Sequence, residues 1–138
     1  MIDVSQARRD YLHTDLLDRV ADGDYAAFAT LYFDLWRPVQ RYAQMLLTDA
    51  ADAQDVAAAV FVEIWHSALA YPRQSTEGQT VLSWAMTITR RRCLKRPKHG
   101  TTSHMTVMAH DRHLKCQLGL LLAAGGARRS ATCRCMEG

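Results

Sequence analysis

An aromatic side chain and a row of cations stand close together in the segment Gln79–Arg96, QTVLSWAMTITRRRCLKR. Apolar residues recur in it at spacings of three and four, no Gly or Pro interrupts it, and Pro97 follows, so the pattern predicts a helix. At about 100° per residue, Trp84, Arg91 and Lys95 fall along one edge of the apolar stripe. A nucleic-acid base can stack on an indole ring while phosphates meet cationic side chains. The segment is therefore a candidate nucleic-acid surface.

Two explanations of this segment remain open from the sequence. In the first, the cations bind phosphates, and they are Arg90, Arg91, Arg92, Lys95 and Arg96. In the second, Trp84 belongs to the core and the cations are solvated in the last turn, where the helix dipole favours positive charge. Because Trp84 lies at the edge of the stripe, its spacing favours neither explanation.

Charge is distributed unevenly along the 138 residues. Residues 1–89 carry 6 Lys or Arg against 12 Asp or Glu, whereas residues 90–138 carry 11 against 2. An acidic body with a basic end can bind one protein surface and one polyanion. The length suits one domain with a modest core, and a content of 49% apolar residues excludes disorder throughout.

The N-terminus and the cysteines indicate a cytoplasmic protein. No apolar run follows the charges of the N-terminus, so it does not read as a secretory signal. The apolar run Leu118–Ala124 is far too short to span a membrane, and we expect no membrane partner. In the cytoplasm the four cysteines should stay reduced.

Five side chains in the last third of the chain have the chemistry of zinc ligands: His110, His113, Cys116, Cys133 and Cys135. Their spacing is unorthodox, since the last two form Cys-x-Cys rather than Cys-x2-Cys, so we predict no metal site and no cofactor. No set of His, Cys, Ser or carboxylate residues has catalytic spacing, so we also expect that the protein is not an enzyme.

The first part of the chain predicts two helices after a loose N-terminal leader at residues 1–13. Thr14 or Asp15 can cap a short helix that Gly23 ends. Asp24 then caps a long helix with a sustained one-sided apolar stripe, in which Pro38 should produce a bend.

A third helix and the basic helix follow. Asp52 can cap the third helix, and the polar loop Tyr71–Gly78 separates it from the basic one. Residues 98–138 show no lasting period, apart from a short helix predicted at Lys115–Ala124. The sequence therefore predicts an all-α fold, a small bundle of about four helices at residues 14–97 with an irregular basic tail at residues 98–138.

Three stretches of sequence follow one another in order over about residues 15–96. They are DLL at 15–17 with GD at 23–24 and LY at 31–32, DAQDV at 52–56 with VFVEIW at 60–65, and LSWAMTITRRR at 82–92. Together they resemble region 2 of the extracytoplasmic-function (ECF) sigma factors of bacterial RNA polymerase. The resemblance implies a protein that binds core polymerase and promoter DNA, without bond chemistry.

The resemblance also implies which residues meet each partner. The third helix would dock on the coiled coil of the polymerase clamp, through Gln54, Asp55, Val56 and Glu63. Of these, Val56 also fits a core position.

On the DNA side, the loop and the fourth helix would capture and melt the promoter −10 element on the non-template strand. The loop that carries Tyr71 and Arg73 would hold a flipped base, although Arg73 also fits a solvated position. Trp84 would abut the melted pair, and the five cations of the basic helix would hold the backbone.

The sequence departs from the family pattern in ways that support a second hypothesis. Ala57–Ala59 stands where family members usually carry polar residues, often Thr-Gln-Glu, that help grip the clamp, and Arg91 stands where Asn is common. Nothing in residues 98–138 reads as the helix-turn-helix that recognises the −35 element, so this end looks truncated or frameshifted. The alternative is an interaction remnant that binds core polymerase or an anti-sigma factor without initiating transcription. A helical domain of unrelated purpose is the third possibility.

Overall fold

A computed structural model describes residues 4–72, 79–96 and 102–125. This part of the chain contains helices and no strand. The helices are α1 (Val4–Ala21), α2 (Tyr25–Leu46), α3 (Ala50–Ser67), the 3-10 helix η1 (Ala68–Ala70), α4 (Val81–Leu94) and α5 (Thr102–Ala124). The all-α prediction is confirmed, with one α-helix more than the four expected.

The helix starts are fixed by side chains that accept hydrogen bonds from the backbone. Asp24 caps α2 as predicted, because its carboxylate accepts from the Ala27 N–H at 3.1 Å. The predicted cap of α3 was one turn too late, since Asp49 rather than Asp52 accepts from the first N–H groups of that helix. Thr80 begins α4 through a reciprocal capping box with Ser83.

The core lies where α2, α3 and α4 meet. Phe28 and Leu35 of α2, Phe61 and Ile64 of α3, and Val81 of α4 are at most 1% exposed. Full burial of an aliphatic or aromatic side chain contributes about 1.5–3 kcal/mol. The one-sided stripe predicted for the long second helix is therefore the face that builds this core, and α2 runs through Pro38 without interruption.

The first helix corrects the predicted loose leader. Residues 4–13 form the first half of α1, which continues to Ala21. His13, Leu17 and Val20 are buried, so the second half of α1 is held by packing. His13 Nε2 also lies 3.4 Å from Asp34 Oδ2 on α2. No Gly or Pro interrupts α1 after Val4, which explains why the helix extends backward from this anchored half.

The last helix corrects the predicted irregular tail. α5 covers 23 residues, Thr102–Ala124, of which the sequence predicted only the second half. Leu114 and Leu118 are 7% and 6% exposed and belong to the same core as α2, α3 and α4. Leu118, Leu121 and Leu122 follow Leu114 by four, seven and eight residues, which places all four on one helix face. Residues 98–101 and 126–138 lie outside the described part.

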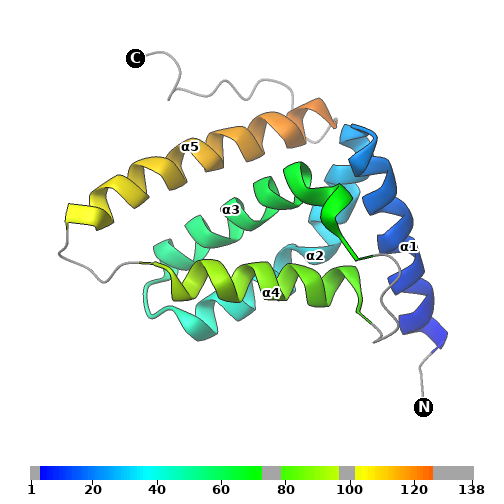
Figure 1. Ribbon diagram of the computed structural model, residues 1–138, viewed down its shortest axis with the longest axis horizontal. Coiled ribbons are helices and arrows are strands. Elements are labelled where there is room, and N and C mark those ends of the chain that lie inside the picture. Colours follow the sequence, from blue (N-terminus) through cyan, green and yellow to red (C-terminus); the bar gives the residue numbers. More distant parts are fainter. Residues whose placement is uncertain (1–3, 73–78, 97–101, 126–138) are drawn as a thin grey trace.

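The arrangement in Figure 1 places α3 between α4 and α5. α4 runs opposite to α3 along one side of it, and α5 runs in the same direction as α3 along the other side. α2 packs against all three, and α1 crosses the end of the bundle where α2 begins. None of the helices described here combines the length and the apolarity needed to cross a membrane.

Candidate nucleic-acid interface

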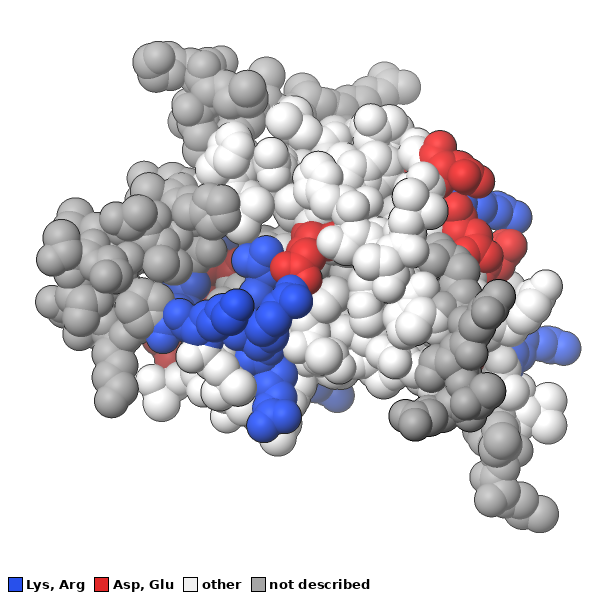
Figure 2. Space-filling view, viewed as in Figure 1, with Lys and Arg blue, Asp and Glu red and all other residues white. Residues whose placement is uncertain are grey.

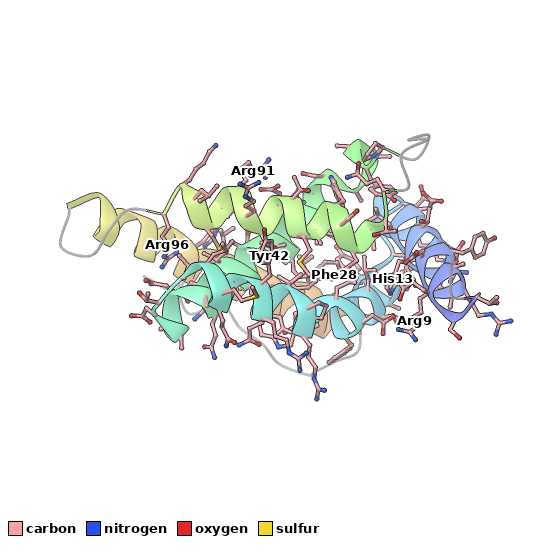
Figure 3. All side chains as sticks on the ribbon, turned by 90° about the horizontal axis from the view of Figure 1, so that it is seen from below. Arg9, His13, Phe28, Tyr42, Arg91 and Arg96 are labelled. Atoms are coloured by element: carbon pink, nitrogen blue, oxygen red, sulfur yellow. The ribbon has the colours of Figure 1, made fainter. Side chains whose placement is uncertain are left out.

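The second half of α4 and its C-cap residue Lys95 present four cations at the molecular surface. Arg90, Arg91 and Lys95 are exposed and Arg92 is half-buried. We call these four residues the basic cluster. Figure 2 shows the Lys and Arg surface gathered at this end of α4, with an acidic surface beside it. Figure 3 shows Arg91 on the outer side of α4.

Trp84 continues the line of the basic cluster toward the start of α4. Seven residues separate Trp84 from Arg91, so the two side chains point in nearly the same direction about 10 Å apart along the axis. Trp84 is half-buried and Thr87 between them is exposed. The indole therefore belongs in part to the core and in part to the surface, and both explanations drawn from the sequence hold for it.

Tyr71 supports this indole from inside the molecule. Its ring meets the Trp84 ring edge-on, with centroids 5.4 Å apart and planes at 65°. Its hydroxyl donates to the Gln79 carbonyl at 2.9 Å, and the side chain is part of the core with 5% exposure. Tyr71, predicted as a DNA contact in the loop that would hold a flipped base, therefore lies behind the indole in this structure, and its contact with DNA stays a prediction. The predicted contact Arg73 lies outside the described residues.

Glu63 of α3 reaches into the basic cluster. Its Oε1 accepts from Arg92 Nε at 3.0 Å, and its Oε2 pairs with Arg91 Nη2. Arg90 and Lys95 make no ion pair with any residue of the described ranges. Glu63, predicted to contact polymerase, thus neutralises part of the charge on the predicted DNA surface.

Arg96 is separated from the basic cluster although it directly follows it in sequence. Its side chain is 4% exposed, and Nη2 lies 2.7 Å from Asp52 Oδ1 and 3.5 Å from Asp55 Oδ2. α4 ends at Leu94, so the chain has left the helix when it reaches Arg96. Figure 3 shows Arg96 on the inner side of this end of α4. Arg96, predicted to hold the DNA backbone, thus has its guanidinium engaged by two carboxylates inside the protein, and its contact with DNA stays a prediction.

The residues predicted to contact polymerase are dispersed over different environments. Gln54 is exposed, whereas Val56 is 3% exposed and belongs to the core. Asp55 is buried and pairs with both Arg96 and Lys115. Lys115 was not singled out from the sequence; its position one residue after Leu114, at the edge of the apolar stripe of α5, is the signal that could have indicated it.

The cysteines and histidines of the described part do not form a ligand group. No set of three or more His, Cys, Asp or Glu side chains within it could hold a metal ion. Of the five zinc-ligand candidates, only His113 and Cys116 have described side chains. Burial raises the pKa of the Cys93 thiol, and the nearby Arg96 guanidinium offsets part of this rise. Cys93 is therefore a protonated core residue near neutral pH.

Comparison with known protein families gives one match. The family model described as Sigma-70 region 2 matches residues 31–99, which is half of the chain. The match includes most of α2, all of α3 and α4, and the basic cluster. Neither the curated proteins nor the solved structures gave a match.

Proposed function

We propose that the chain, which belongs to the sigma-70 family and carries its region 2, is an ECF-type sigma factor. Interaction with core RNA polymerase and promoter DNA is the family role of this region. In this proposal it binds the polymerase clamp and recognises and melts the promoter −10 element. It would act in the bacterial cytoplasm, where an anti-sigma factor could control it.

The observation that carries the DNA half of the proposal is the stripe on α4. A half-buried indole and the exposed side chains of Arg91 and Lys95 lie in one line. The edge contact with Tyr71 holds the indole in place, so a base can stack on it at small entropic cost. Each cation that neutralises a phosphate adds to the salt dependence of binding. The stripe thus suits one separated DNA strand.

The first test measures binding of a single-stranded non-template −10 oligonucleotide to the full chain. We expect Trp84→Ala to weaken binding about tenfold or more, because stacking contributes about 1–3 kcal/mol per base. Arg91→Ala should lower affinity and also reduce the slope of log affinity against log salt by about one unit. Fluorescence anisotropy at several salt concentrations gives both quantities.

Arg41→Ala is the matched control for this test, because Arg41 is equally exposed but lies on α2. It removes the same charge and should leave the affinity nearly unchanged. If Trp84→Ala and Arg91→Ala bind as tightly as the unmodified protein, the stripe on α4 is not the DNA surface.

The second candidate function is an interaction protein that binds core polymerase or an anti-sigma factor without starting transcription. The burial of Ala57, Ala58 and Ala59 in a helix proposed for clamp contact favours it, as does the engagement of Asp55 by two cations. Run-off transcription with purified core separates the two functions. Core binding without a transcript from any promoter would favour the second.

A further inference from the structure

The helix that follows the family match lies along one side of α3. The match ends at residue 99, and α5 begins at Thr102. α5 packs against α3 more extensively than any other two helices of the described chain pack against each other. Figure 1 shows the two helices side by side and in the same direction. A helix outside the matched region thus occupies a surface of a helix inside it.

An ion pair fixes the first contact between these two helices. Lys115 Nζ pairs with Asp55 Oδ1, and the two side chains are 44% and 13% exposed. Asp55 was assigned to polymerase contact on the basis of the sequence. In this structure α5 supplies a cation to that carboxylate, so a partner that seeks Asp55 must replace Lys115.

Small side chains occupy the middle of the α3 face that follows Asp55. Residues three, four and seven positions after Asp55 lie on the same face of α3. These are Ala58, Ala59 and Val62, and all three are at most 3% exposed. Alanine leaves room for a close approach, and Leu118 of α5, which is 6% exposed, belongs to the same core cluster as Ala58 and Ala59. This is the geometry of an amphipathic helix lying in an apolar groove.

The far end of α5 lies beside both the end of α3 and the start of α2. Trp65 and His66 of α3 line a small cavity together with Leu120 and Leu121 of α5. A Cβ atom on Gly125 would lie 2.5 Å from the Tyr25 carbonyl oxygen, so only glycine permits this approach to α2. α5 therefore lies along α3 from Asp55 to Trp65.

We propose that α5 is an autoinhibitory helix: it occupies in cis the α3 face from Asp55 to Trp65, on the helix through which the proposed function has the protein bind core polymerase. The inference rests on the proposed function. A helix of core polymerase that displaces α5 must bring what α5 brings: a cation opposite Asp55 and leucine-sized side chains opposite the alanines. Because α5 is tethered to the surface, it competes at a high effective concentration. The apparent affinity for core equals the intrinsic affinity multiplied by the fraction of molecules in which α3 is uncovered.

The test measures binding of purified core polymerase to the full chain in three variants. Leu118→Ala loosens α5 through its buried contact, and Lys115→Glu places a carboxylate against Asp55 at a site that is 44% exposed. Leu69→Ala is the matched control, because it makes the same truncation at a side chain that is 79% exposed. We expect core affinity to rise about tenfold in Leu118→Ala and about fivefold in Lys115→Glu, with Leu69→Ala unchanged.

Circular dichroism and binding of the single-stranded −10 oligonucleotide, which involves α4, verify that each variant is folded. If folded Leu118→Ala and Lys115→Glu bind core with the affinity of the unmodified protein, or more weakly, α5 does not compete and the inference is overturned while the proposed function stands. If none of the proteins binds core, the polymerase half of the proposed function is overturned, and the inference with it.

Discussion

Glu63 neutralises part of the positive charge of the basic cluster, which is the proposed DNA surface. Its side chain is 19% exposed and accepts hydrogen bonds from two guanidinium groups, those of Arg91 and Arg92. Arg91 is itself 50% exposed, so the pair is partly screened by water. Phosphate oxygens must compete with this carboxylate for the same donors. Arg90 and Lys95 do not meet such competition within the described ranges.

Replacing Glu63 by Gln should therefore strengthen the binding of single-stranded DNA. The amide keeps the shape of the side chain but removes its charge, which releases the two guanidinium groups. A partly exposed ion pair contributes about 0.2–1 kcal/mol, so we expect affinity to rise up to about fivefold. Anisotropy titrations with the −10 oligonucleotide measure the change.

Asp15→Asn controls for the change in net charge, because the Asp15–Arg19 pair lies on α1 and is exposed at both ends. It should change affinity much less than Glu63→Gln. Equal effects of the two substitutions would mean that overall charge, rather than the release of Arg91 and Arg92, governs binding.

At the scale of the elements, the turn between α1 and α2 depends on one glycine. Gly23 has a φ of 87°, a conformation that side-chain-bearing residues rarely adopt. A Cβ atom placed there would meet no atom within 4 Å. The cost of any substitution therefore comes from the backbone conformation and not from a steric clash with the rest of the protein.

Gly23→Ala should lower the free energy of unfolding by about 1–2 kcal/mol, which is the cost of a left-handed conformation for an L-residue. Gly23→Asn should cost less, because Asn tolerates this region better than other side chains. Urea unfolding followed by far-ultraviolet circular dichroism measures both. An alanine variant as stable as the unmodified protein would contradict the positive φ.

The sequence indicated α2, α3 and α4 well because each carries its own apolar stripe and a clear start or end signal. Only the second half of α5 was predicted from the sequence. The helix is stabilised by packing on α3, whose small residues Ala58 and Ala59 lie far away in the sequence, and a local pattern does not reveal such packing. The inward direction of Arg96 was likewise hidden, because composition shows a row of cations but not where α4 ends. The helix at residues 4–13 differs from the predicted loose leader because this half of α1 is mostly polar and exposed and shows no apolar stripe of its own.

At the scale of the whole molecule, Arg96 joins three helices that are distant in sequence. It extends from the end of α4 to Asp52 and Asp55 of α3, and Asp55 continues to Lys115 of α5. The guanidinium is 4% exposed and the two carboxylates are 12% and 13% exposed. Removing a partner from such a network leaves buried charge uncompensated, which costs more than the network contributes.

Arg96→Leu should therefore destabilise the fold by about 3 kcal/mol. Lys95→Leu, at the exposed neighbouring position, should stay within about 0.5 kcal/mol. Chemical denaturation of the full chain gives both values. Adding Asp52→Asn to Arg96→Leu should recover part of the loss, and no recovery would show that Arg96 acts through packing alone.

The hydrogen bond from the Tyr71 hydroxyl to the Gln79 carbonyl has a consequence for how recognition could diversify. It joins the two ends of the segment between η1 and α4. The entropic cost of bringing these ends together is therefore met during folding and does not recur on binding. Under the proposed function, substitutions within the segment would alter which DNA sequence is recognised while the Tyr71–Gln79 hydrogen bond is kept. Selection can then change the residues between Tyr71 and Gln79 independently of the residues that hold the helical bundle together.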